Sequence, residues 1–568
     1  MEPVQHYIQE GILYEPVIPN IHDWPMNLFF KNKKQIVKDV VAEATDQLHT
    51  QAQQEGIVIQ DYIARTMYLE RIRMNEDPWK VDPKDEQKFW GGIKKALVKN
   101  DQVEGDVEAF TQANEEMLER IVSRYANEIS SNFKPSSYHF AKRFLPFLFS
   151  TLLNASAGKT FKSLINHRLQ LQEKVHLLGE IEAMRNLASK GTLILVPTHT
   201  SNMDSILIAW GIHALGLPAF IYGAGLNLYN HKIISYFLTR LGAYKLDRRK
   251  RNPIYRATLD AYSTVAIQEG VHGLFYPGGT RSRSGELESK IKLGLLQTAI
   301  EGQRRNFMYP PAHNRGKIFI VPLVISYHFV LEAASLIKQH LKRTGQEQYY
   351  IMNDEFGSSR KFLQFVWNTF SASSEIALSF GKPMDIFGNF VGEDGQSYDK
   401  EGREIDISSY FKSGGVITDD KQRDREYTRL LGEKIVERYK VENLVFSSHL
   451  VAFVAFQLIS RKYPDLDLYG LLRLQGEEKV LSLEEFHESV DRVLKQLFKM
   501  ADEGKLKLAR HMINDAKSII EHGVKNLGLY HAKRPLTFQG EHQLISENIN
   551  LLYYYHNRLS GYNLAPFV

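Results

Sequence analysis

The chain has 568 residues, of which 43% are hydrophobic and 24% charged, and this predicts more than one globular domain with an ample core. Its net charge of +5 is modest and does not indicate a nucleic-acid partner. The absence of cysteine excludes disulfides, thiolate nucleophiles and cysteine-ligated metals, and it is compatible with a reducing cytoplasm.

Residues 1–135 are predicted to form a helical, charged N-terminal region. Met1 is followed by polar and charged residues, so we expect no secretory signal. Segments 35–53 and 106–125 carry apolar residues at helical spacing, and segment 77–85, with two prolines, is a break. We find no catalytic constellation in this region.

The segment 138–153 mixes bulky apolar residues with Lys142 and Arg143. Two interpretations remain open: a buried core helix, or a helix lying in a membrane interface. Segment 450–459 is also apolar, and here we favour a buried core helix. Both segments are shorter than the ~20 apolar residues that a membrane span needs, so we expect no transmembrane helix.

From about residue 190 to 390, short apolar runs alternate with helical segments. Helices are predicted at 254–268 and 292–300, among others. The predicted strands are 192–196, 219–222, 243–246, 273–276, 318–325 and 376–380. Such alternation predicts an α/β fold with a mostly parallel central sheet flanked by helices.

A basic run lies inside this part of the chain. It comprises Arg240, Lys245, Arg248, Arg249, Lys250, Arg251 and Arg256, opposed only by Asp247. We see neither an array of stacking aromatics nor a helix that would read nucleic acid nearby. The run therefore favours an anionic substrate or anionic lipid headgroups as its partner.

Residues 391–423 are rich in Gly, Asp and Ser, which predicts a loop or hinge. After it, segments 426–439, 483–501 and 544–559 have helical spacing. We therefore expect three parts: a helical N-terminal region (1–135), an α/β domain (136–390, with its core at 190–390), and a helical C-terminal region (391–568).

The first chemical motif is Val196-Pro-Thr-His-Thr-Ser-Asn-Met-Asp204, between a predicted strand and a predicted helix. Open α/β sheets place ligand sites at such strand ends. An imidazole held by a carboxylate, here His199 and Asp204, can take a proton from an alcohol. The alternative is a helix cap, because Ser201, Asn202 and Asp204 are all N-cap residue types.

The second motif is Phe275-Tyr-Pro-Gly-Gly-Thr-Arg-Ser-Arg-Ser-Gly285, again after a predicted strand. The adjacent glycines Gly278 and Gly279 allow a close backbone approach to a ligand. Arg281 and Arg283 are two apart, so an extended segment projects both to the same side, where paired guanidiniums suit a phosphate. The alternative is a plain glycine-rich turn with exposed arginines.

Together, four ordered blocks resemble the glycerolipid acyltransferase superfamily, which includes glycerol-phosphate and lysophospholipid acyltransferases. The blocks lie at 199–204, 242–248, 276–285 and 321–326. One position departs from the family pattern, because Gly278 stands where a glutamate is usual. The length, Lys292-Leu-Gly294, and the segments 447–453 and 552–559 look most like the glycerol-3-phosphate acyltransferases.

The resemblance implies transfer of a fatty acyl group to the 1-hydroxyl of glycerol 3-phosphate. The donor would be a thioester of coenzyme A or of acyl carrier protein, with no metal or other cofactor. His199 would be the general base and Asp204 its orienting partner. Arg248, Arg281 and Arg283 would bind the phosphate, and backbone amides at Gly278 and Gly279 would stabilise the oxyanion.

The resemblance also implies a peripheral protein on the cytoplasmic face of a membrane. Two alternatives remain open. One is acylation of lysophosphatidate or another lysolipid. The other, from a different class, is an inactive membrane- or partner-binding protein that keeps the acyltransferase fold.

Overall fold

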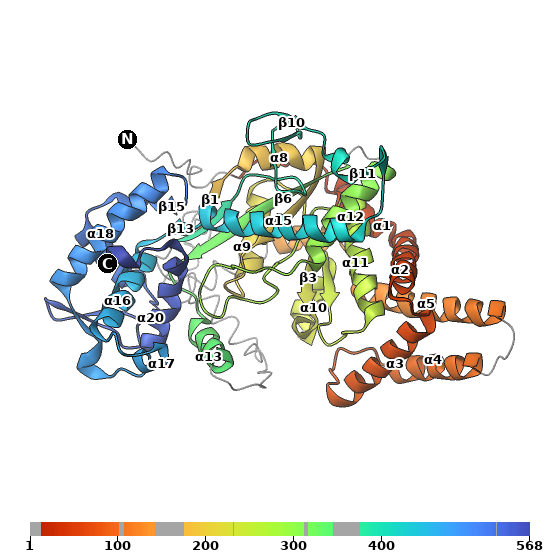
Figure 1. Cartoon of the computed structure of the whole chain (residues 1–568), viewed down its shortest axis with the longest axis horizontal. Helices are drawn as coiled ribbons and strands as arrows, with labels where there is room; N and C mark the ends of the chain where they lie inside the picture. Colours follow the sequence, from red (N-terminus) through yellow and green to blue (C-terminus); the bar gives the residue numbers. More distant parts are fainter. Residues whose placement is uncertain are drawn as a thin grey trace.

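The computed structural model describes residues 13–101, 107–142, 175–230, 232–311, 316–344, 375–529 and 531–568. The molecule is elongated (Figure 1). Helices of the N-terminal part, drawn in red and orange, lie at one end, and the C-terminal part, in blue, lies at the other. The central sheet and its covering helices lie between them.

The described N-terminal part is helical, as predicted. Its helices are α1 (Pro25–Lys31), α2 (Lys33–Glu55), α3 (Ile59–Glu76), α4 (Glu86–Asp101) and α5 (Val107–Ile129). On α5, Leu118, Ile121, Val122 and Tyr125 recur at helical spacing and are completely buried. They belong to one apolar cluster with α11 (Pro253–Gln268), so the N-terminal helices pack directly on the α/β part.

A seven-stranded sheet forms the centre, in the order β1-β7-β6-β2-β5-β3-β4. Five neighbours from β6 to β4 are parallel, whereas β7 and β1 run the opposite way. The strands are β1 (Val175–Gly179), β2 (Gly191–Pro197), β3 (Ile221–Gly225), β4 (Ala243–Leu246), β5 (Gly273–Leu274), β6 (Lys317–Tyr327) and β7 (Ile376–Phe380). The expected mostly parallel α/β sheet is confirmed, and β1 is an addition to it.

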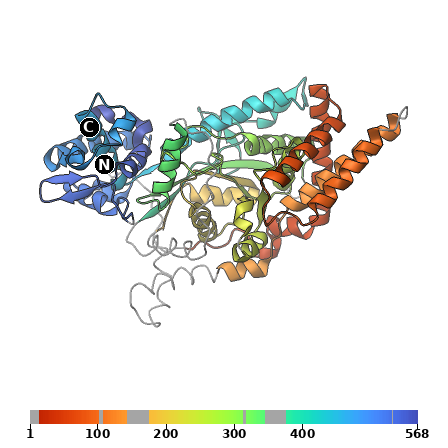
Figure 2. The same cartoon turned by 90° about the horizontal axis from the view of Figure 1, so that it is seen from below.

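The alternation of side chains along β2 divides the core into two layers. Leu193 and Leu195 face a cluster with α8 (Ile181–Lys190) and α9 (Asp204–Ala214). Ile194 and Val196 face the other cluster, with α12 (Gly294–Met308) and α15 (Lys421–Glu442). Figure 2 shows α15 on one side of the sheet and the α8 and α9 layer on the other.

The predicted loop at 391–423 contains short paired strands. These are β8 (Phe390–Val391), β9 (Ser397–Tyr398), β10 (Glu404–Ile405), β11 (Lys412–Ser413) and β12 (Val416–Ile417). The helix that follows, α15, carries Leu431, Ile435 and Tyr439 into the central core. A boundary at residue 390 would thus separate α15 from the sheet that it covers.

The C-terminal part has helices α16 (Ser447–Lys462), α17 (Leu468–Leu471), α18 (Leu483–Asp502), α19 (Ala516–Asn526) and α20 (Ile549–His556). It also has strands β13 (Leu444–Val445), β14 (Val480–Ser482), β15 (Lys507–Leu508), β16 (Thr537–Gln539) and β17 (Gln543–Ile545). The helix expected over 544–559 is therefore shorter, since its first residues pair as β17. α16 is buried all round, as expected for segment 450–459.

In the described part of the chain, no helix has the length and apolar content to cross a bilayer. Of the segment 138–153, only residues 138–142 are described, and they are helical. There the Tyr138 ring packs edge-on to Trp24 at 5.0 Å. Phe140, 52% exposed, stacks on Phe237 at 6.0 Å. The rest of that segment lies outside the described residues.

The expectation that the whole basic run meets an external anion is wrong for two of its members. Arg249 binds Asp82 and Asp247, and Lys250 binds Glu128. Lys250 is only 6% exposed. Because buried cations need such partners, these two side chains hold the N-terminal helices against β4.

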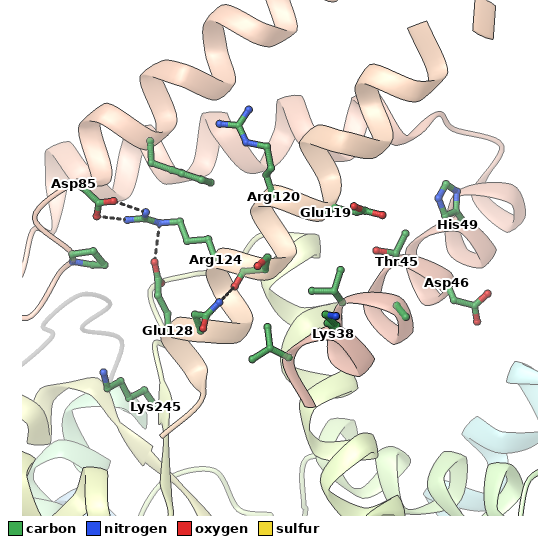
Figure 3. A pocket seen from close by; sticks show the side chains of 17 residues that line it. Lys38, Thr45, Asp46, His49, Asp85, Glu119, Arg120, Arg124, Glu128 and Lys245 are labelled. Carbon is green, nitrogen blue, oxygen red and sulfur yellow. Dashed lines mark hydrogen bonds and ion pairs between the residues drawn. The ribbon is translucent and has the colours of Figure 1, made fainter. Parts of the chain in front are cut away.

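The N-terminal helices border a groove of about 1190 Å³ (Figure 3). Arg124 binds Asp85 and Glu128 on one side of this groove, and Lys245 of β4 lies beside it. β4 is the edge strand farthest from β1, and β5 and β3 separate it from β2. The groove is therefore distinct from the turn that follows β2.

Candidate active site

The turn after β2 is fixed to the neighbouring strand before the helix begins. The Thr198 amide donates to Leu323 O of β6 at 2.9 Å, extending the ladder by one bond. Residues 199–203 then turn away, and α9 begins at Asp204. The polar motif thus lies at the carboxyl end of a central parallel strand, the edge where α/β sheets bind ligands.

Asp204 is completely buried, and both carboxylate oxygens accept hydrogen bonds. Oδ2 accepts from the amides of Thr200 (2.7 Å) and Ser201 (2.9 Å), and Oδ1 accepts from the Tyr327 hydroxyl (2.5 Å). The alternative helix-cap interpretation is wrong for this residue. Its carboxylate bonds to amides before the helix, and the N-cap residue itself is Met203.

The structure brings His199 and Asp204 together, with Nδ1 and Oδ2 2.8 Å apart. An ionised carboxylate only accepts, so Nδ1 carries the proton and Nε2 keeps its lone pair. The imidazole stacks on the Tyr276 ring at 4.1 Å and 25°. Its side chain is 19% exposed, so a substrate can reach it.

The second motif lies directly against the first. The Ser282 amide donates to His199 O at 2.7 Å, and the stacked ring of Tyr276 comes from the same motif. Gly279 has φ +72°, and a Cβ there would lie 2.8 Å from the Lys292 side chain. This turn therefore requires glycine at position 279.

One predicted oxyanion donor is already engaged. The Gly279 amide donates to Tyr276 O at 2.9 Å and closes the turn. The expectation that this amide points at a reacting oxygen is wrong in this conformation. Of the two glycines, only Gly278 has an amide outside the described hydrogen bonds.

Arg281 contacts the residue before α13 (Ala333–Thr344), and Arg283 contacts the middle of that helix. Arg281 pairs with Glu332 at 3.4 Å, and Arg283 donates to Gln339 at 3.3 Å. Arg248 is exposed after β4, at the far edge of the sheet. β3 lies between β4 and β5, the strand that precedes Arg281 and Arg283, so Arg248 follows a strand two positions away from theirs. Its part in a phosphate site stays a prediction.

Sequence reasoning missed two half-buried carboxyl groups beside the dyad. Glu288 accepts the His199 amide at 2.7 Å, and burial raises its pKa to about 7. Glu332 accepts the Asn202 amide (2.9 Å) and the Ser201 hydroxyl (3.0 Å), and burial raises its pKa as well. Nothing in their local sequence marks either acid, because both contacts depend on the tertiary fold.

The C-terminal part contributes to the same site. His449 Nε2 lies 2.9 Å from the main-chain carbonyl oxygen of Tyr327, the same tyrosine whose hydroxyl binds Asp204. Arg558, 7% exposed, donates to Ile325 O at 3.0 Å. The sequence did carry a signal for these residues, because segments 447–453 and 552–559 resemble acyltransferase segments.

Three histidines lie together in the described part of the chain, outside the dyad. His328, His511 and His522 bring ring nitrogens within 4.8 Å of one another. However, His511 Nε2 accepts the Ser447 amide at 3.1 Å, which uses one lone pair and leaves the proton on Nδ1. The ring therefore has no lone pair for a metal in this arrangement, and the dyad itself needs none for proton transfer.

A sequence model of the family described as Acyltransferase matches residues 179–326. That span runs from the last residue of β1 almost to the end of β6 and contains both motifs. Residues 179–326 are thus similar to the Acyltransferase family.

The relatives are glycerol-3-phosphate acyltransferases. The chain is 26% identical over 291 residues to that of Pseudoalteromonas atlantica (strain T6c / ATCC BAA-1087), covering 51% of this chain and 31% of that protein. It is 24% identical over 392 residues to that of Pseudomonas syringae pv. tomato (strain ATCC BAA-871 / DC3000), covering 69% and 39%. The chain thus spans well under half the length of these relatives.

Among solved structures, the chain matches the 1-acyl-sn-glycerophosphate (LPA) acyltransferase PlsC from Thermotoga maritima. The match has 14% identity and a TM-score of 0.23, and it covers 67% of this chain and 93% of that one. A superposition this loose carries no information on the site.

Proposed function

We propose that this protein transfers a fatty acyl group from a thioester to the 1-hydroxyl of glycerol 3-phosphate. The observation that carries the proposal is the His199–Asp204 pair, with Nε2 left for a substrate at the carboxyl end of β2. The names of the relatives support this acceptor. The donor would be acyl-CoA or acyl-ACP.

In the proposed reaction, His199 Nε2 takes the proton of the acceptor hydroxyl as its oxygen attacks the thioester carbonyl. Asp204 stabilises the imidazolium that forms. The tetrahedral intermediate then collapses, the carbon–sulfur bond breaks, and the thiolate takes the proton back from the imidazolium. No acyl-enzyme forms, because the substrate alcohol is the nucleophile.

Arg281 and Arg283 would hold the acceptor phosphate. Arg281 contacts Glu332 and Arg283 contacts Gln339, at and before α13. A guanidinium can bind a phosphate through two parallel hydrogen bonds. The Gly278 amide remains the candidate oxyanion donor. Arg248, which follows the edge strand β4, would be the third guanidinium for this phosphate.

A side-by-side acylation assay tests the proposal. Wild type should acylate glycerol 3-phosphate in preference to lysophosphatidate, and His199→Ala should lower turnover by about 10²–10⁴-fold while keeping the fold. Preference for lysophosphatidate would instead support the alternative function, acylation of a lysolipid. Absence of turnover with both acceptors would favour the inactive binding protein.

We further propose peripheral binding to an anionic membrane surface on the cytoplasmic side. Exposed Phe140 and Tyr236 lie near each other through Phe237, and the Arg240 guanidinium covers the Tyr236 ring at 3.9 Å. Aromatic side chains beside cations suit the headgroup boundary. In liposome flotation, Phe140→Glu with Tyr236→Glu should weaken binding to anionic vesicles. Unchanged flotation of this double variant would contradict that surface.

A further inference from the structure

Glu288 belongs to the loop between the second motif and α12. Its carboxyl group fills the space over Gly278, where a Cβ would lie 3.1 Å from Glu288 Cγ and 3.2 Å from Oε1. The backbone of Gly278 is not in the left-handed region, so only Glu288 stands against a side chain there. The Glu288 carboxyl group therefore occupies the space that a side chain at residue 278 would need.

The same carboxyl group holds the main chain of the catalytic histidine. His199 donates its amide to Glu288 Oε1 at 2.7 Å and accepts the Ser282 amide at its carbonyl at 2.7 Å. Its ring is held by Asp204. Three contacts thus fix the backbone, the carbonyl and the imidazole, and Glu288 provides the first of them.

A half-buried acid is an energetically costly acceptor for a single amide. Taking a carboxylate out of water costs several kcal/mol even after relaxation. A neutral group, such as a glutamine amide, would accept the same hydrogen bond. The buried cation of Arg558 attracts the Glu288 carboxyl group, as does His199 itself. The acid is therefore part of the charge arrangement around the imidazole.

We propose that Glu288 is a positioning residue for the reaction. From the loop after the second motif, it supplies the carboxyl group for which Gly278 leaves space, and it aligns His199 for proton transfer through the main-chain amide. This inference rests on the proposed acyl transfer. It assigns to Glu288 an effect on turnover, not on binding of the acceptor.

Removing the carboxyl group should misplace the imidazole, and a shift of about 1 Å costs on the order of 10²-fold in rate. We expect Glu288→Ala to lower kcat by about 10- to 100-fold, with the KM for glycerol 3-phosphate changed less than about twofold. Glu288→Gln keeps an acceptor for the amide, so its kcat should be intermediate. The exposed Glu286, two residues earlier in the same loop, gives the matched control Glu286→Ala, which should keep wild-type kcat.

A transplanted carboxyl group separates positioning from packing. In the double variant Gly278→Glu with Glu288→Ala, the new side chain starts from the emptied space, and kcat should recover most of the loss. A Glu288→Ala kcat within twofold of wild type would overturn the inference. So would a loss that appears in KM, or a loss that the double variant fails to restore while thermal melting shows both variants folded. If Glu288→Ala does not fold, a wild-type kcat in Glu288→Gln overturns the inference and an intermediate one supports it.

The two proposals fail in different ways. If wild type turns over and His199→Ala does not, acyl transfer stands and only the Glu288 variants are being judged. If wild type does not turn over at all, the imidazole nitrogen resonances of His199, identified by their absence in His199→Ala, give a second measurement. Glu288→Ala should shift them and Glu286→Ala should not. Unshifted resonances in Glu288→Ala would overturn the inference.

Discussion

Replacement of Asp204 by asparagine isolates the charge behind the imidazole. The two oxygens accept different bonds: Oδ2 faces three N–H donors, and Oδ1 faces the Tyr327 hydroxyl. An asparagine can therefore place its oxygen at the Oδ2 position. Its NH₂ group would then face the tyrosine hydroxyl, which can rotate to accept. We expect this variant to fold and to keep His199 in place.

What the variant loses is the negative charge that stabilises the imidazolium. Two unit charges about 4 Å apart interact by about 4 kcal/mol at an effective dielectric constant of 20. Because each 1.36 kcal/mol is tenfold in rate, kcat should fall by about 10³-fold. The assay is steady-state acylation of glycerol 3-phosphate, alongside thermal melting. A folded Asp204→Asn protein with kcat within tenfold of wild type would refute this account of the dyad.

Three further predictions follow from other contacts. Arg281→Ala or Arg283→Ala should raise the KM for glycerol 3-phosphate by about 10- to 100-fold with little change in the KM of the acyl donor, since a charge-assisted hydrogen bond contributes about 1.5–3 kcal/mol; lysine should restore it only in part, and an unchanged acceptor KM would remove both arginines from the phosphate site. Arg304 is 2% exposed and binds Asp424, Asp419 and Glu301, so Arg304→Met should lower the free energy of unfolding by about 3–5 kcal/mol in urea titrations; a loss below 1 kcal/mol would contradict the importance of this cluster. Burial raises the pKa of Glu288 from 4.5 to about 7. The folded state therefore binds this proton more tightly than the unfolded state. The free energy of unfolding should fall by about 3 kcal/mol as pH rises from 4.5 to 7, and Glu288→Gln should lack that part of the pH dependence; equal slopes for the two proteins would contradict it.

The elements with a clear local period could be predicted from the sequence. Strands β4 and β7 begin and end at the predicted residues, because each is a short, mostly apolar run bordered by a glycine, Gly242 before β4 and Gly381 after β7. β1 was not predicted, since a five-residue edge strand carries too short a pattern. The strands within 391–423 have two residues each, which is too few to show the two-residue alternation of apolar and polar side chains that marks a strand. Only glycines such as Gly395 and Gly402, with φ of +82° and +79°, marked their turns.

The site was predictable where its members are close in sequence. The spacing of His199 and Asp204 around a strand end was enough to expect their contact. Glu288 and Glu332 were not predictable, because they meet the His199 turn across 89 and 130 residues of chain. The same limit applies to the basic run. Sequence gives the charge of Arg249 and Lys250 but not their partners in the N-terminal part, which are Asp82 between α3 and α4 and Glu128 on α5.

The burial of Arg558 beneath the site has a consequence for synthesis on the ribosome. About 360 residues separate His199 from Arg558, and at roughly 5–20 residues per second they take between ~20 and ~70 s to translate. Throughout that interval, the strands of residues 179–326 lack the C-terminal residues that share their apolar cluster. The nascent chain therefore exposes apolar side chains to solvent for tens of seconds. Ribosome-bound chaperones are the natural protection for such a chain, and expression of residues 179–326 alone would leave that surface uncovered permanently.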